Sequence, residues 1–155
     1  METKTRFDAF ERGDRSALVC VDETELHNAA VDQLAAAGYK IHTGLFAEDI
    51  ALKMKMYTYD VVLVFEHFNE ADIEANAVLS ELNKVPTSQR RGQFVVLLGP
   101  SMATDDDMQA FRMSVDLVIG IADLPNLGLV LGRAAARREA FYRQFKECAT
   151  MAGMM

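Results

Sequence analysis

The stretch Asp60-Val61-Val62-Leu63-Val64-Phe65-Glu66 decides the fold predicted for this chain. Its five central residues are apolar, and three of them are valines, whose branched side chains favour extended backbone. An acidic residue bounds the run on each side. The stretch therefore predicts a strand over residues 61–65, and the segments around it indicate the kind of sheet to which that strand belongs.

Further apolar runs alternate with helical patterns along the rest of the chain. Strands are expected over residues 17–21, 39–45, 61–65, 94–98 and 117–121. Helices are expected at about residues 24–37, at 47–57, after a cap at Asn69, from Thr104 onward, and at 126–149. This alternation predicts an α/β, flavodoxin-like (βα)5 fold. We expect a three-layer sandwich around a parallel five-stranded sheet of order 2-1-3-4-5, with an extended C-terminal helix.

Composition narrows the classes of function. The chain has 155 residues, with 16 basic and 23 acidic side chains and a net charge of −7. This balance argues against nucleic acid and against anionic membranes as partners. The first residues are polar and lack the apolar core of a signal peptide. Cys20 and Cys148 form no metal or redox motif, so a reducing, cytoplasmic location is expected.

Three segments resemble the receiver domains of bacterial response regulators (CheY-like domains). They are Leu18–Glu23, Tyr59–Val64 and Val115–Val118. The resemblance spans residues 16–138 and divides the chain into an N-terminal segment (1–15), a receiver-like domain (16–136) and a C-terminal helix extension and tail (137–155).

The resemblance implies that the positions for phosphotransfer are degenerate. In receiver domains, two acids after the first strand bind Mg²⁺, and here they match Asp22 and Glu23. The phosphate-accepting aspartate maps to Phe65, the hydroxyl residue to Gly99, and the lysine to about Ile121. A carboxylate nucleophile and a cation are needed to form an aspartyl phosphate. We therefore expect an apolar plug at this place and a pseudo-receiver, which is a signalling module without enzymatic activity or cofactor.

Glu66 leaves alternatives open. If the strand bends at its end, Asp22, Glu23 and Glu66 form an acidic cup that holds Mg²⁺. The alternative function is then a divergent Mg²⁺-dependent phosphoacceptor that uses Glu66 or Asp60. Asp22 and Glu23 are otherwise helix N-terminal acids, favoured by the helix dipole. A third hypothesis is a small-ligand domain, for example for a nucleotide, at the carboxyl ends of the strands.

The last helix carries the strongest positive signal. Its second half, beyond Arg137, contains Phe141, Tyr142 and Phe145 among basic residues, and exposed aromatic stripes of this kind mark interfaces. We expect binding to a protein partner or homodimerisation through a surface that also includes Phe111 and Val118. The alternative is that Phe7 and Phe10 of the N-terminal segment cover this helix within one chain.

Overall fold

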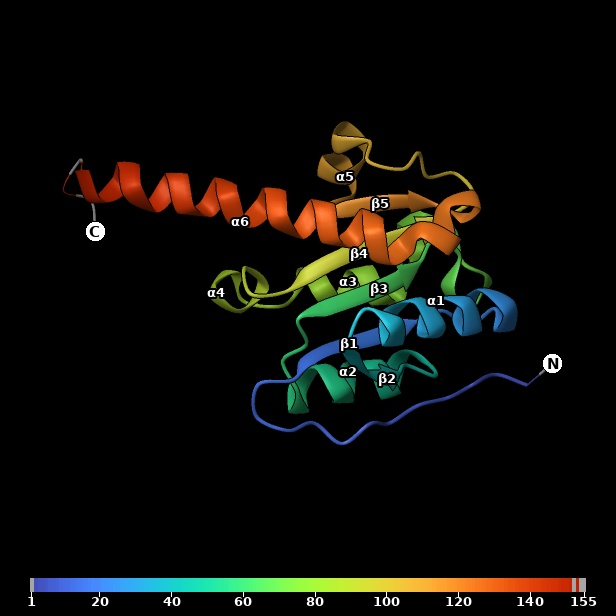
Figure 1. Cartoon of the computed structure of the whole chain (residues 1–155). Helices are drawn as coiled ribbons and strands as arrows, with labels where there is room; N and C mark the ends of the chain where they lie inside the picture. Colours follow the sequence, from blue (N-terminus) through green and yellow to red (C-terminus); the bar gives the residue numbers. More distant parts are fainter. Residues whose placement is uncertain (1, 152, 154–155) are drawn as a thin grey trace.

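Five parallel strands form a single sheet of order β2-β1-β3-β4-β5 in the computed structural model, which describes residues 2–151 and 153 (Figure 1). The strands are β1 (Arg15–Cys20), β2 (Tyr39–Thr43), β3 (Val61–Phe65), β4 (Phe94–Gly99) and β5 (Leu117–Gly120). The predicted fold class and strand order are confirmed. The end of the chain expected as a tail includes residues 152, 154 and 155, which lie outside the described residues.

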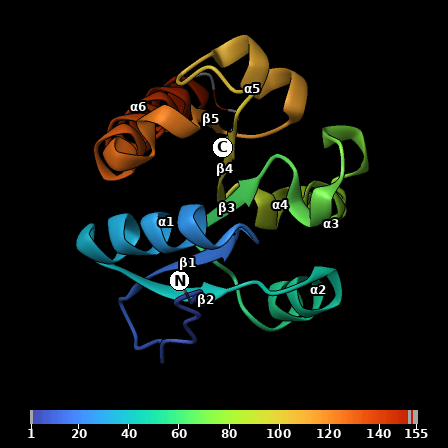
Figure 2. The same ribbon diagram turned by 90° about the vertical axis from the view of Figure 1, so that its right-hand side faces the viewer.

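Helices cover both faces of the sheet (Figure 2). They are α1 (Thr24–Ala36), α2 (Ala47–Met56), α3 (Ala77–Asn83), α4 (Thr87–Arg90), α5 (Asp107–Met113) and α6 (Leu127–Met151). One core lies between the sheet and helices α1 and α6. A second core lies between the opposite face and helices α2, α3 and α5. Strands β1, β3, β4 and β5 therefore bury alternate side chains in two separate cores, which explains their unbroken apolar runs.

The third predicted helix begins later than expected. Asn69 does not cap a helix; it lies in a 3-10 turn, η1 (Phe68–Glu70), with φ at 60°. Its N–H donates to the Asp22 carboxylate at 2.7 Å, a contact that holds this turn in place. After a second turn, η2 (Ile73–Ala75), Asn76 caps α3 by accepting the N–H groups of Val78 and Leu79. The helix is therefore displaced by a long-range contact to Asp22.

Three other boundaries also differ from the predictions. A short helix, α4, lies between α3 and β4, where the sequence pattern predicts none. Helix α5 begins at Asp107 because Asp106, not Thr104, accepts the first free N–H group, that of Gln109. The last helix, α6, runs from Leu127 to Met151 instead of 126–149, and a 3-10 segment, η3 (Ile121–Asn126), precedes it.

The N-terminal segment packs against the edge strand β2. Phe7 and Phe10 stack on the ring of His42, each with ring centroids 4.1 Å apart. Backbone hydrogen bonds join Asp8 to Ile41 and Thr43 to Arg6. The two phenylalanines are thus engaged at β2, and the hypothesis that they cover the end of the last helix is wrong. Their contact shields a strand edge that would otherwise be open to pairing.

The contact at His42 predicts a pH dependence of stability. Its Nε2–H donates to the Asp8 carbonyl at 2.9 Å, and its Nδ1 accepts from the Tyr59 hydroxyl at 2.8 Å. Burial lowers the pKa of His42 and also that of His27. Below the ordinary histidine pKa the unfolded chain then binds more protons than the folded chain, so stability falls as the pH drops from 7.5 through 5. Urea denaturation at several pH values measures this loss.

A variant identifies the groups responsible. His42→Asn should flatten the pH dependence between 7.5 and 5, with His27 supplying what is left. Asp8 contributes to the pH dependence of stability at lower pH than the histidines. Burial opposes its ionisation, but hydrogen bonds from Arg6 and Ile41 outweigh burial and lower its pKa, so its contribution is lost only in stronger acid. An unchanged slope in His42→Asn would contradict the assignment.

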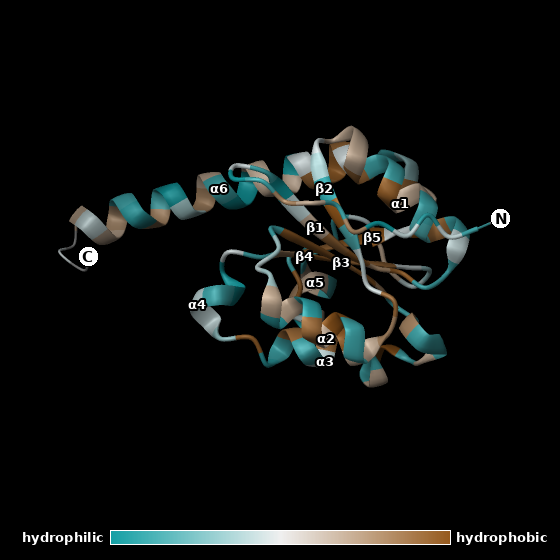
Figure 3. Cartoon of the chain, turned by 90° about the horizontal axis from the view of Figure 1, so that it is seen from below, coloured by the Kyte–Doolittle hydropathy of each residue, from teal (hydrophilic) through white to brown (hydrophobic). Residues whose placement is uncertain are grey.

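Helix α6 extends beyond the sheet. Its first half is anchored by Leu127, Val130, Leu131 and Ala134, which are all buried. Its second half projects past the amino-terminal ends of the strands (Figure 1) and carries mixed polar and apolar residues (Figure 3). None of the helices in the described part of the chain is long and apolar enough to cross a membrane.

Candidate functional site

The acids after β1 are both occupied by backbone contacts. The Asp22 carboxylate accepts from the N–H of Asn69. The Glu23 carboxylate caps α1 by accepting the N–H groups of Glu25 and Leu26. Glu23 therefore acts as the helix N-terminal acid that one of the sequence hypotheses described.

Glu66, and not Phe65, occupies the space above Gly99. Glu66 is 4% exposed, and its Oε1 accepts from the N–H of Ser101 at 3.0 Å. A Cβ atom added to Gly99 would lie 2.1 Å from Oε1 and 2.4 Å from Cβ of Glu66. Phe65 packs against the opposite core, between the sheet and α1 and α6. The expected plug of Phe65 on Gly99 is therefore wrong, because consecutive residues of a strand face opposite sides.

Strand register also changes the position assigned to the receiver lysine. Gly99 of β4 pairs with Gly120 of β5. Ile121 is the next residue, where η3 begins, and it packs against the core beside α1 and α6. The residue opposite Gly99 is therefore a second glycine, which supplies neither a cation nor a hydroxyl group.

The predicted acidic cup is not formed. Among residues 2–151 and 153, no three His, Cys, Asp or Glu side chains are placed to hold a metal ion together. Glu66 lies 3.3 Å from the His67 ring and is directed to Ser101, whereas Asp22 is directed to Asn69. Asp60 precedes β3 and accepts from the N–H of Ser16, at the opposite end of the strands. A strand of five residues is about 16 Å long, so Asp60 is too far away to replace the phosphoacceptor.

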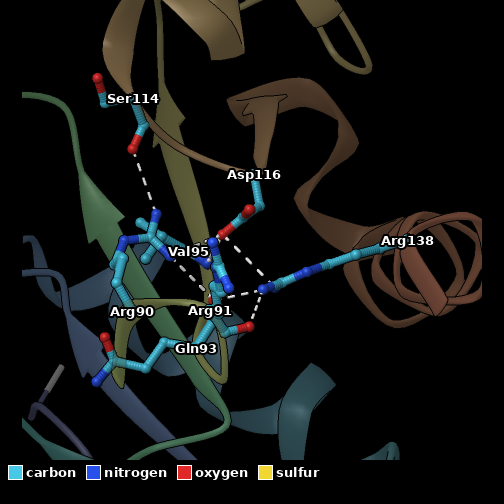
Figure 4. Close-up of polar contacts among 7 residues, drawn as sticks. All are labelled: Arg90, Arg91, Gln93, Val95, Ser114, Asp116 and Arg138. Carbon is cyan, nitrogen blue, oxygen red and sulfur yellow. Dashed lines mark hydrogen bonds and ion pairs between the residues drawn. The ribbon is translucent and has the colours of Figure 1, made fainter. Parts of the chain in front are cut away.

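The amino-terminal edge of the sheet carries a more developed constellation, centred on Arg138 of α6 (Figure 4). Its guanidinium donates to the carbonyl oxygens of Gln93, at 2.9 Å, and of Arg91. It lies 3.8 Å from Asp116, which also pairs with Arg90 at 3.1 Å. Arg138 thus joins α6 to the segment before β4 and, through Asp116, to the start of β5.

Aromatic rings complete this anchor. The Arg138 guanidinium lies over the rings of Phe94, at 5.4 Å, and Tyr142, at 5.5 Å. Arg138 lies between the buried first part of α6, which ends at Ala134, and the exposed Phe141, and its amphipathic side chain suits this boundary. One feature of the sequence indicates this role: Arg138 interrupts an otherwise apolar stripe that runs from Ala134 to Phe141.

A groove of about 940 Å³ opens where α6 leaves the sheet. The amino-terminal ends of β1 to β4 form one wall, and α6 forms the other. The groove is lined by Phe141, Tyr142 and Phe145, three of the residues predicted to form an interface. Phe141 is 66% exposed and Phe145 is 57% exposed. The structure thus brings these three predicted residues together on one surface.

The other two predicted interface residues lie elsewhere. Val118 is fully buried at the centre of β5 and is unavailable to a partner, so this prediction is wrong. The error arose because β5 is covered by α5 on one face, which the apolar pattern alone did not show. Phe111 is 80% exposed on α5 but does not line the groove.

Comparison with known proteins rests on structure alone, because no family model and no curated protein sequence matches the chain. The receiver domain of the Francisella response regulator 1452 has a TM-score of 0.61 at 13% identity, over 80% of this chain and 98% of that one. Chemotaxis response regulator CheY4 of Vibrio cholerae has a TM-score of 0.62 at 15% identity, over 78% and 98%. A CheY-like receiver domain protein from Methanospirillum hungatei has a TM-score of 0.63 at 13% identity, over 83% and 98%.

This chain has the receiver-domain fold. Such low identities concern the fold and leave activity to be argued from the site. Within this receiver fold, the carboxyl edge of the sheet holds a buried glutamate packed on a glycine. The amino edge holds a cationic, aromatic groove under a projecting helix.

Proposed function

We propose that this receiver-fold domain is a phosphorylation-independent signalling module. It acts by binding a protein partner or a second copy of itself through the projecting half of α6. The observation that carries the proposal is the exposed aromatic surface formed by Phe141, Tyr142 and Phe145 on that half.

The carboxyl edge of the sheet supports independence from phosphorylation. By its resemblance to receiver domains, Phe65 matches the acceptor position, and a phenylalanine supplies no nucleophile. Glu66 fills the space above Gly99, and the glycine pair Gly99–Gly120 supplies neither of the polar groups that receiver domains use there. A phosphoryl group at this place would lack electrostatic stabilisation from a cationic side chain.

The shape of α6 supports an interaction role. About half of this 25-residue helix is anchored in the core, and the remainder presents large apolar rings to solvent. Exposed apolar patches of this kind carry a free-energy cost that association removes. Phe7 and Phe10, the rings proposed as an internal cover, are held at β2.

Replacing Phe141 and Phe145 by serine tests the proposal. Because both rings are exposed, we expect the double variant to keep the free energy of unfolding within about 1 kcal/mol of the wild type. Association should be lost, which light scattering shows for self-association and fluorescence anisotropy shows for a bound peptide. As a control in the same helix, Leu131→Ala should cost about 3 kcal/mol because Leu131 is buried.

A stability loss in the serine variant as large as that of Leu131→Ala would assign the rings to the core and would contradict the proposal. If the wild-type chain is monomeric at high concentration, the self-association mode fails. The exposed aromatic surface would then have to bind a different protein.

A further inference from the structure

Two hollows meet beneath the projecting helix. The larger is the groove of about 940 Å³, and the smaller is a pocket of about 320 Å³ between α3, α4 and the start of β5. They share Arg91, Arg138 and Tyr142 as lining residues. Their surfaces therefore form one continuous depression, with an apolar part along α6 and a cationic part around the arginines.

We propose that this depression binds an acidic amphipathic helix from a partner protein, with apolar residues on one side and Asp or Glu on its flanks. The inference rests on the proposed function and specifies the chemistry of the partner. The depression is lined by more basic than acidic side chains, although the whole chain carries a net charge of −7. The basic residues are Arg15, Arg90, Arg91, Arg138 and Lys146, and the acidic ones are Asp60, Asp116 and Glu139.

Local contacts leave Arg91 and Lys146 as the exposed cations of the depression, because Arg90 and Arg138 pair with Asp116 and Arg15 donates to the Ala37 carbonyl. Asp60 is engaged by the N–H and hydroxyl of Ser16, and Asp116 is engaged by the N–H of Val95 as well as by Arg90. Arg91, by contrast, is an exposed residue at the rim where the two hollows meet. A carboxylate of the partner would meet a guanidinium there, and such pairs form strong, bidentate hydrogen bonds.

The apolar part fits the side chains of a helix. It contains Phe94, Leu131, Phe141 and Phe145, which come from both walls of the groove. The stretch of α6 from Leu131 to Lys146 is about 22 Å long at 1.5 Å per residue, enough to face four turns of a partner helix. Helices bind such grooves through apolar anchors spaced three and four residues apart.

Charge disfavours a second copy as the occupant. Between residues 137 and 151, α6 carries four basic and two acidic side chains. Pairing the projecting half of one copy with the groove of another would bring two positively charged surfaces together, which costs affinity. The net negative charge of the whole chain likewise opposes binding to nucleic acid or an anionic membrane.

The test uses the full chain and two labelled synthetic helical peptides of about 18 residues, a length that spans about 27 Å. Both carry the same leucine face; one has glutamates on its flanks and the other has lysines. By fluorescence anisotropy we expect the glutamate peptide to bind at least about tenfold more tightly than the lysine peptide. Added salt should reduce this preference.

Charge reversal in the protein provides the second arm. Arg91→Glu combined with Lys146→Glu replaces two exposed lining residues, so the fold should be kept. This variant should lose at least about tenfold in affinity for the glutamate peptide and should favour the lysine peptide. The matched control reverses Arg12 and Arg112, which are exposed but line neither hollow, and should retain wild-type binding.

Several results would overturn the inference. One is equal binding of both peptides. If that binding is lost in the Phe141 and Phe145 double serine variant, the proposed function still holds, but the partner need not be acidic. Absence of binding by either peptide also overturns it. So does tighter binding of single-stranded DNA or of anionic phosphatidylserine vesicles, or a stable dimer in which light scattering shows that α6 is already occupied.

Discussion

Gly99→Ala is expected to lower the free energy of unfolding by about 3 kcal/mol, because the new methyl group overlaps Glu66. The nearest atoms include the Cβ of Glu66, at 2.4 Å, as well as its carboxylate. Rotation of the glutamate relieves the contact with Oε1 but not with Cβ, so the backbone has to move. Serine or threonine, the hydroxyl residues of receiver domains, should cost at least as much at this position.

Two companion variants isolate this effect in urea denaturation. In a Glu66→Gly background, Gly99→Ala should cost much less, because the overlapping side chain is gone. Gly132→Ala serves as the matched glycine control. Its new Cβ meets nothing within 4 Å, and it lies within α6, so alanine there should stabilise by about 1 kcal/mol. If Gly99→Ala is as stable as the wild type, Glu66 does not fill the space above Gly99.

Arg138→Ala is the second large effect, with an expected loss of about 3 kcal/mol. The variant removes hydrogen bonds to the carbonyls of Gln93 and Arg91 and uncovers the ring of Phe94. It also removes one of the two arginines that pair with Asp116, the other being Arg90. Because this side chain anchors the point where α6 leaves the sheet, hydrogen exchange in the preceding turns of α6 should speed up as well.

Lysine at position 138 should recover little of the loss, because an ammonium group cannot form the same planar set of hydrogen bonds or stack on the rings. The neighbouring Arg137→Ala provides the control. Arg137 is exposed and pairs with Asp105 at the surface, so its loss should change stability by about 0.5 kcal/mol or less. Equal stabilities for the alanine variants at positions 137 and 138 would refute the anchoring role.

The sheet could be predicted because its information is local. Strands β1, β3, β4 and β5 each appear in the sequence as a short apolar run, and strand order follows from the fold class that such alternation indicates. The start of α3 could not be predicted in this way. Asn69 and Asn76 are equally good caps by residue type, and the choice between them depends on Asp22, which is 47 residues from Asn69 in sequence.

The candidate site was predictable in part. A phenylalanine at position 65, which matches the receiver acceptor by resemblance, was visible in the sequence, as was the aromatic stripe of α6. The burial of Glu66 could not be predicted, because its side chain fits only where Gly99 of the neighbouring strand has no Cβ atom. For Arg138, the interrupted apolar stripe marked the residue but not its contacts, since its partners Gln93 and Asp116 come from other parts of the chain.

Val118 shows the converse error. Apolar residues of an outer strand look the same in sequence whether they face a partner or a helix of the same chain. The structure places Val118 in the core shared with α5, whereas the exposed residues of that helix, such as Phe111, stay available. Exposure therefore separates interface residues from core residues where composition does not.

The central claim, that this receiver fold works without phosphorylation, is tested most directly by intact-mass spectrometry. The full chain is incubated with a small-molecule phosphodonor and Mg²⁺, beside an active receiver domain as a positive control. We predict that the control gains one phosphate and that this chain gains none, because Phe65 offers no nucleophile and the Glu66 carboxylate is buried against Gly99 and Ser101. A gain of one phosphate that disappears in Glu66→Gln would contradict the claim.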